Sequence, residues 1–218
     1  MPLLQTLSRV EQKQLTRQKL LDATIDLIAE QGLSRVTLGK VAQRTGLSRG
    51  ICNYHFETKE QLMLEAFRML YREHEQAWRS VAACQGENPA QRLQTLLETL
   101  LMPPIADHRK LAVWMAFWGV APQRETYLEI CAGIDREYEA EVEGLLRQLS
   151  GGSEHVNGMS LKAISVTLTS MIDGFWLNYL IAPGCLEPED AVKASLAFLS
   201  SFFTEFRPLI VETENIAP

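Results

Sequence analysis

Helix-breaking residues divide most of this chain into segments of helix length, and this limits its possible folds more than any other feature. The breaks fall at Asn88-Pro89, Pro103-Pro104, Pro122, Gly151-Gly152, Asn157-Gly158, Pro183-Gly184 and Pro188. The segments between them suit helices: Ala90–Met102, Asp107–Val120, Arg124–Leu149, Ser160–Ile181 and Glu189–Phe206. We find no convincing run of alternating strand residues and no internal repeat. The pattern predicts an all-α protein.

Capping signals define shorter helices nearer the N-terminus. Apolar residues recur with a helical period over Lys13–Glu30, and Gly32 follows as a stop signal. Three further helices are predicted from their caps: Leu38–Thr45 after Thr37, Arg49–His55 after Ser48, and a long helix to about Val81 opened by Thr58 and Gln61. The total is about nine helices, with a three-helix head before a larger helical body.

Composition excludes several other classes of protein. With 218 residues, 46% of them hydrophobic, the chain can bury a core without metal or disulfide support. The longest apolar run, Leu111–Pro122, is too short to cross a bilayer, and no signal peptide is visible. The four cysteines are scattered without a CxxC pair, which favours free thiols. We therefore expect a cytoplasmic protein without a bound metal.

Charge is distributed unevenly along the chain. The formal net charge of −6 divides into +3 over residues 1–60 and −9 over the remainder. A basic head on an acidic body is weak evidence for a module that binds a polyanion. Chance variation is the alternative explanation.

The stretch Thr37–Phe56 has the layout of a helix-turn-helix: a helix of about eight residues, a turn at Gly46 and a second short helix. We expect Leu47 and Ile51 to pack inward. The outer face of the second helix would then carry Ser48, Arg49, Gly50, Cys52, Asn53 and Tyr54. An ordinary corner between two helices is the structural alternative.

The residue types on that face suit double-stranded DNA. Arg49 and Asn53 can read base edges in the major groove, and Gly50 permits close approach. Tyr54, His55 and Lys59 suit phosphate groups. The complete set of candidate DNA contacts is Thr37, Lys40, Arg44, Thr45, Ser48, Arg49, Gly50, Asn53, Tyr54, His55 and Lys59.

The run from Arg17 to Phe67 resembles the N-terminal domain of the TetR family of transcriptional regulators, and Tyr54-His55-Phe56 followed by Lys59-Glu60 is especially typical. The resemblance implies a homodimer that binds a palindromic operator through two heads, and a variable body that binds a small effector. It assigns residues 1–60 to DNA binding and 61–218 to effector binding and dimerisation. Asn53 departs from the aromatic residue of many members, so the operator sequence is open.

Two stretches of the body, Lys110–Val120 and Met171–Tyr179, resemble the choline-responsive repressors of the betaine-synthesis pathway. Each also places aromatic residues on one helical face. Two such faces and a carboxylate could form a cage for a quaternary ammonium ion. The candidate effector contacts are Trp114, Phe117, Trp118, Tyr127, Asp173, Trp176 and Tyr179, with Phe175 and Tyr138 as further candidates. A plain aromatic core is the alternative.

The resemblance also implies that the last two long helices form the dimer. On the last of them, an apolar stripe at helical spacing is the candidate interface: Leu196, Leu199, Phe202, Phe203 and Phe206. Two helices from each protomer would then make a four-helix bundle. The alternative is that this stripe belongs to an internal core.

Together these features predict a ligand-responsive repressor without a cofactor. The sequence contains none of the nucleophile, P-loop or dinucleotide-binding motifs that would indicate an enzyme. One candidate role is control of choline and glycine betaine metabolism. The alternative is a repressor of an efflux or other catabolic operon that responds to a lipophilic drug, a polyamine or an acyl ligand. A redox role for Cys52 is a further, minor alternative.

Overall fold

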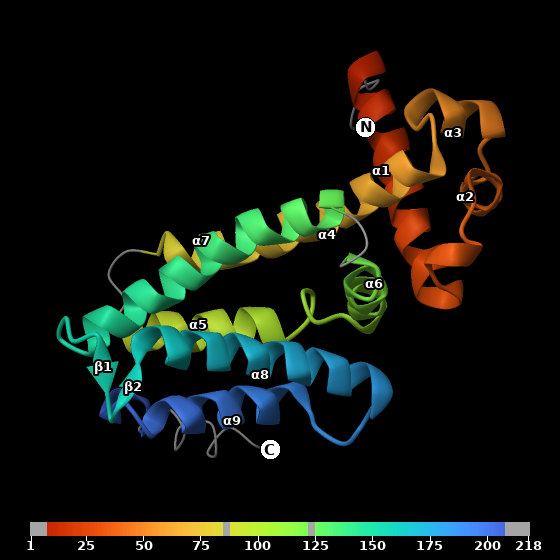
Figure 1. Ribbon diagram of the computed structural model, residues 1–218. Helices are drawn as coiled ribbons and strands as arrows, with labels where there is room; N and C mark the ends of the chain where they lie inside the picture. Colours follow the sequence, from red (N-terminus) through yellow and green to blue (C-terminus); the bar gives the residue numbers. More distant parts are fainter. Residues whose placement is uncertain (1–7, 85–87, 122–124, 208–218) are drawn as a thin grey trace, which may run out of the picture. The chain divides into compact units, whose positions relative to one another are not determined.

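The computed structural model describes residues 8–84, 88–121 and 125–207, and they form the predicted all-α fold (Figure 1). Nine α-helices lie in these ranges: α1 Arg9–Gln31, α2 Leu38–Thr45, α3 Arg49–His55, α4 Lys59–Ala82, α5 Pro89–Leu101, α6 His108–Trp118, α7 Glu125–Leu149, α8 Leu161–Ile181 and α9 Pro188–Ser200. The predicted break at Pro122 and the predicted helix start at Arg124 lie outside the described residues. None of the described helices has the length and apolar character needed to span a membrane.

The chain forms two compact units. The first comprises Met1–Leu70 and Ala112–Tyr127, and the second comprises Tyr71–Leu111 and Leu128–Pro218. Helix α4 continues through residue 60 and contributes residues to both units, as does α6. The functional division at residue 60 stays a prediction.

In the first unit, α1 packs against α2, and α2 packs against α3. The buried face of α1 carries Leu20, Leu27 and Ile28, which have the predicted helical spacing. This helix begins four residues before Lys13 because Ser8 and Glu11 form a reciprocal capping box. The predicted box at Thr58 differs in detail. The Gln61 amide donates to the Thr58 hydroxyl, but the Gln61 side chain accepts from the Glu57 amide.

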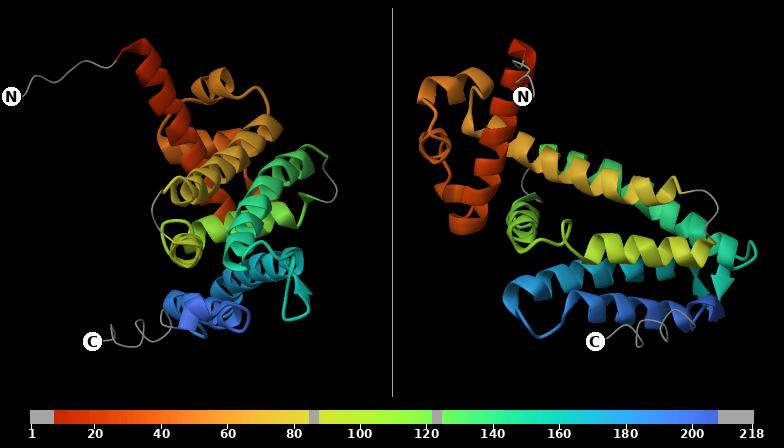
Figure 2. Two further views of the ribbon diagram at one scale, coloured as in Figure 1. Left: turned by 90° about the vertical axis from the view of Figure 1, so that its left-hand side faces the viewer. Right: turned by 180° about the vertical axis from the view of Figure 1, so that it is seen from behind.

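In the second unit, α5, α8 and α9 lie side by side (Figures 1 and 2), and each of these helices packs against the other two. The buried face of α5 carries Leu93, Leu97 and Leu100. Trp176 of α8 donates its indole N–H to the backbone carbonyl of Leu100, with 2.9 Å between the two atoms. This bond satisfies a buried donor within the apolar interior.

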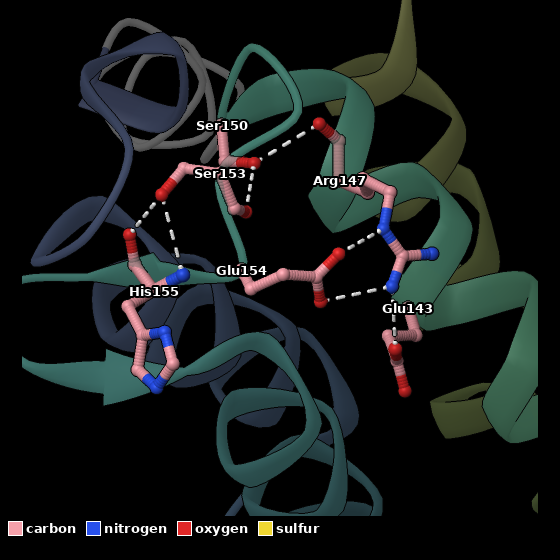
Figure 3. A network of polar contacts seen from close by, with 6 residues as sticks. All are labelled: Glu143, Arg147, Ser150, Ser153, Glu154 and His155. Atoms are coloured by element: carbon pink, nitrogen blue, oxygen red, sulfur yellow. Dashed lines mark hydrogen bonds and ion pairs between the residues drawn. The ribbon is translucent and has the colours of Figure 1, made fainter.

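A short hairpin between α7 and α8 was not predicted from the sequence. Strands β1 His155–Val156 and β2 Met159–Ser160 pair across Asn157 and Gly158, both of which have positive φ. Figure 3 shows how the hairpin is joined to the end of α7. Arg147 pairs with Glu143 one turn earlier and with both carboxylate oxygens of Glu154. The predicted break at Asn157-Gly158 is therefore a hairpin turn.

Helix α9 corrects two predictions. The expected helix Glu189–Phe206 ends at Ser200, and a separate 3₁₀ turn, η3, covers Thr204–Phe206. The interface stripe is also wrong for most of its members, because the structure buries Leu196, Leu199, Phe203 and Phe206 within the subunit. Helix α9 packs against α5 and η3, so this apolar face belongs to the internal core. Phe202, in contrast, is half-exposed.

A candidate DNA-binding surface and a buried aromatic cluster

Helices α2 and α3 form the predicted helix-turn-helix. The Thr37 hydroxyl caps α2 by accepting from the Lys40 amide at 3.2 Å, and the Ser48 hydroxyl caps α3 by accepting from the Ile51 amide at 3.2 Å. Gly46 closes α2 with φ of 69°, the left-handed conformation that glycine adopts without strain. These local contacts fix the turn between the two helices.

The buried side of α3 differs from the prediction. Cys52 is fully buried, whereas Ile51 keeps 37% of its surface exposed. The expected outward position of Cys52 and inward position of Ile51 are therefore wrong. Burial raises the pKa of the Cys52 thiol, which makes it a poor target for oxidation.

The other predicted residues of α3 do lie at the surface. Arg49, Gly50 and Asn53 are exposed, and so is Ser48 before them. Arg49 and Asn53 are one helical turn apart, so they share a face. Within the described residues, Arg49 forms no ion pair or hydrogen bond. Its guanidinium is thus available to a base edge or a phosphate group.

Three predicted DNA contacts already bind groups of the first unit. The Lys40 ammonium donates to the Gln31 side chain at 2.6 Å and to the Arg35 carbonyl at 2.8 Å. Arg44 forms a two-pronged ion pair with Glu30 of α1. The Lys59 ammonium donates to the Ser34 carbonyl at 3.0 Å. These groups would have to exchange or share their partners on meeting DNA.

Thr45, another predicted contact, is buried. Its hydroxyl donates to the Val41 carbonyl at 2.9 Å, one turn earlier in α2. This residue stabilises the helix-turn-helix from within and is not part of the candidate surface.

Tyr54 and His55 lie at the end of α3, beside the first turns of α1. Tyr54 is 70% exposed, and the Lys13 ammonium lies over its ring at 5.0 Å from the centroid. Burial lowers the pKa of His55, and the positive charges of Lys13 and Arg17 lower it further. The end of α3 and the start of α1 thus form one positively charged region. Sequence analysis missed the contribution of α1, although Ser8-x-x-Glu11 is a recognisable start signal.

The predicted effector residues divide between the two units. In the first unit, Trp114, Phe117 and Tyr127 are buried around Phe67, while Trp118 is half-exposed. Phe67 stacks on Phe117 with 4.3 Å between ring centroids, and Tyr127 meets the Phe117 ring edge-on at 5.3 Å. The ring-to-ring packing here is typical of an aromatic core.

In the second unit, Trp176 belongs to a row of rings that we call the buried ring cluster: Trp176, His74, Tyr138 and Trp78. The ring centroids are 5.8 Å apart from Trp176 to His74, 6.1 Å from His74 to Tyr138, and 6.0 Å from Tyr138 to Trp78. Burial lowers the pKa of His74 to about 4, so its imidazole is neutral at pH 7.

One carboxylate acts on this cluster. Burial raises the pKa of Tyr138, and the negative charge of Asp173 on α8 raises it further. The indole N–H of Trp78 is buried and has no hydrogen-bond partner among the residues that the structure describes. Asp173 and Trp176 were predicted and Tyr138 was named as a further candidate, whereas His74 and Trp78 were not predicted. The spacing of His74 and Trp78, one turn apart on α4, is the signal that could have found them.

Tyr179, the remaining predicted effector residue, is half-buried. Burial, together with the negative charges of Glu189 and Glu187, raises its pKa to about 12. Its hydroxyl is buried and has no hydrogen-bond partner in the described part of the chain. The influence of Glu187 and Glu189 shows that Tyr179 lies near the start of α9. Among the described residues, no ring contact joins Tyr179 to the buried ring cluster.

The first unit therefore defines a DNA-binding protein of the helix-turn-helix class. A family model described as bacterial regulatory proteins of the tetR family matches residues 20–66, and a model described as the C-terminal domain of BetI-type transcriptional repressors matches residues 89–204. The chain belongs to the TetR family and carries a BetI-type repressor domain. It is a transcriptional repressor.

Curated relatives agree over most of the chain. The HTH-type transcriptional regulator BetI of Stenotrophomonas maltophilia is 24% identical over 183 residues, covering 84% of this chain and 90% of the relative. The protein of that name from Burkholderia thailandensis is 26% identical over 198 residues, covering 83% and 90%.

Solved structures share the fold. A putative transcriptional regulator from Pseudomonas aeruginosa PAO1 superposes with a TM-score of 0.76 at 25% identity, covering 88% of this chain and 92% of that one. A putative regulator from Saccharomonospora viridis, solved in complex with choline, gives a TM-score of 0.73 at 19% identity and covers 86% and 96%.

Proposed function

We propose that this repressor binds a palindromic operator as a homodimer and releases it when a choline-like quaternary ammonium cation enters the second unit. Its targets would then be genes of choline and glycine betaine metabolism. The observation that carries the DNA-binding part is the exposed face of α3, where Arg49 and Asn53 stand one turn apart. In a dimer, two such helices would enter major grooves one helical turn apart, about 34–36 Å.

The proposed DNA contacts have separable roles. Arg49 and Asn53 would read base edges, with Gly50 allowing close approach. Tyr54, His55, Lys40, Arg44 and Lys59 would meet phosphate groups, as would the capping residues Thr37 and Ser48. Phosphate contacts orient the protein without carrying sequence information, so the two groups predict different effects on mutation.

Arg49→Ala tests this assignment. It should reduce the discrimination between operator and random DNA by about 1–3 kcal/mol for each base that Arg49 reads. Lys59→Ala should weaken binding to both duplexes alike, because the Lys59 ammonium would bind a phosphate and no base. Fluorescence anisotropy on both duplexes at several salt concentrations measures the difference. An Arg49 variant with unchanged selectivity contradicts the reading role of this residue.

The buried ring cluster and Asp173 supply the chemistry that a quaternary ammonium ion requires. Ring faces attract such a cation by about 0.5–2 kcal/mol each, and a carboxylate balances its charge in a buried setting. The names of the BetI relatives and the choline in the Saccharomonospora viridis protein favour choline among such cations. We therefore propose Asp173 and Trp176 as effector contacts, with His74, Trp78 and Tyr138 beside them.

The aromatic residues of the first unit remain the alternative location. Trp114, Phe117, Trp118 and Tyr127 stay candidates, although their ring-to-ring packing favours a core. Two conservative substitutions separate the clusters. Trp176→Phe should weaken choline binding and leave operator binding intact, whereas Trp114→Phe should change neither if the effector binds in the second unit.

Calorimetry of the purified dimer tests the effector itself. Choline should bind with micromolar to millimolar affinity, and its uncharged carbon isostere 3,3-dimethylbutanol should bind markedly worse. Asp173→Asn keeps the shape of the side chain and should weaken choline but not the isostere. Asp190→Asn, at an exposed position paired with Lys193, is the matched control and should weaken neither. The proposal would be contradicted if choline gave no heat of binding, or if the isostere bound with the same affinity as choline.

For the dimer, we propose the outward face of α8 together with the exposed side of α9. The apolar residues Val166, Leu177 and Ile181 on α8 are 43%, 43% and 69% exposed. Gly174 lies between them, and the half-exposed Phe198 and Phe202 of α9 contact each other at 5.3 Å between ring centroids. Burying these side chains against a second copy would remove apolar surface from water.

A further inference from the structure

The first turns of α1 project from the first unit with almost no core contact. Every residue from Ser8 to Leu15 is exposed, including Val10 at 67% and Leu15 at 56%. These turns continue the 23-residue helix α1 and are closed by the capping box at Ser8, so they hold exposed side chains on an ordered helix.

This projecting segment and the end of α3 line an open groove of about 620 Å³. Arg9, Lys13 and Thr16 line it from α1, and Tyr54 and His55 line it from α3. Tyr54 directly follows Asn53, the last residue of the proposed base-reading face, so the groove adjoins that end of α3. A molecule bound along α3 would pass this groove.

The electrostatic character of the groove is positive. Within the described part of the chain, Arg9 and Lys13 form no ion pair, unlike Arg17, which is held by Glu65 at 2.7 Å. The Lys13 ammonium is instead held over the Tyr54 ring, which leaves its hydrogen-bond donors without a carboxylate. The side chains of Lys40, Arg44 and Lys59 already bind other protein groups. The cations of the groove, in contrast, can bind a phosphate without first giving up a carboxylate partner.

We infer that this groove binds a backbone phosphate of the DNA that flanks the bases read by α3, with Lys13 and Arg9 as the cationic ligands and Tyr54 positioning Lys13. The inference rests on the proposed operator binding and extends the interface to a helix outside the helix-turn-helix. The phosphate carries a full negative charge and lies at the edge of the DNA major groove that α3 would enter. The Lys13 ammonium carries the opposite charge and lies beside the end of α3, where such a phosphate would pass.

Lys13→Gln tests the inference, and Lys19→Gln is its matched control. Both residues are exposed on α1 and both substitutions remove one positive charge, but Lys19 does not line the groove. The duplex is one that the full-length wild-type protein recovers from a random-sequence pool. Lys13→Gln should make the slope of log K against log salt shallower by about two units per dimer, because each protomer then neutralises one phosphate fewer. Lys19→Gln should leave the slope near that of the wild type.

Ethylation interference locates the contact on the DNA. Ethylation of one phosphate in each half-site should weaken the wild type and Lys19→Gln but leave Lys13→Gln unaffected. This readout responds to DNA phosphates alone, so it separates a backbone contact from a site for free phosphate. Equal slopes and equal interference patterns for the two variants overturn the inference while operator binding stands. A wild-type protein that recovers no duplex contradicts the proposed function itself, and the inference falls with it.

Discussion

The imidazole of His74 shows how burial changes the chemistry of a single side chain. Its pKa falls to about 4, below the ordinary value near 6.5, because the surroundings disfavour the charged form. Between pH 6.5 and about pH 4, His74 is therefore mostly protonated in the unfolded chain and mostly neutral in the folded protein. The free energy of unfolding should decrease as pH falls through this range.

The expected decrease is about 2 kcal/mol between pH 7 and pH 5, and urea denaturation at the two pH values measures it. His74→Phe should remove most of this difference, since the phenyl ring does not titrate. His155→Gln, at an exposed position, is the control and should keep the difference. A His74 variant with the pH dependence of the wild type contradicts the assignment.

Which side chains face inward on α3 could not be predicted from the sequence. The helix has seven residues, so its apolar pattern repeats too few times to fix a face, and Cys52 and Ile51 exchanged roles. The caps Thr37 and Ser48 were predicted correctly because capping depends on neighbours within three residues. The partner of Arg44 lies 14 residues away on α1, beyond the reach of local patterns.

At the scale of an element, the turn between α2 and α3 depends on one backbone conformation. Gly46→Ala should lower the free energy of unfolding by about 1–2 kcal/mol because an L-residue with a side chain is strained at φ of 69°. No neighbouring atom lies within 4 Å of the added methyl group, so the cost would come from strain alone. Gly39→Ala inside α2 is the control and should be neutral or slightly stabilising. Equal stability of the two variants would contradict the role given to Gly46.

Helix positions were mostly predicted, and their ends less so. Proline, glycine and capping residues placed α5, α7 and α8 within one or two residues. The end of α9 was missed because the apolar period continues through Phe202 to Phe206 while the backbone leaves the helix at Ser201. An apolar pattern reports which side chains are buried, and a 3₁₀ turn can bury the same side chains as a helix.

At the scale of the whole molecule, the proposed dimer depends on the exposed apolar side chains of α8. Leu177→Asp should weaken dimerisation by about 100-fold or more, because each interface would contain two unpaired carboxylates. Leu128→Asp on α7 is the matched control, since Leu128 is 46% exposed and Leu177 is 43% exposed. Analytical ultracentrifugation over a concentration series measures both. Equal dimer stability in the two variants would place the interface elsewhere.

The buried ring cluster could be predicted only in part from the sequence. The spacing of Trp176 and Asp173 on α8 was visible, but their neighbours His74 and Tyr138 come from α4 and α7. The period of apolar residues identifies the buried face of one helix. It does not identify which other helix packs against that face. That information arises only when three helices pack together.

The exposure of most α3 residues bears on how the regulator can change its target over evolutionary time. Cys52 is the one residue of this helix that is buried, so the fold places few demands on the remainder. Substitutions at exposed positions usually alter stability by less than about 0.5 kcal/mol. Mutation or design can therefore replace several exposed residues together: Arg49, Gly50, Asn53 and Tyr54. The DNA sequence of the operator would restrict these substitutions more than the stability of the fold would. A gene copy of this repressor could acquire a new operator while keeping its body, its dimer and its chemical signal.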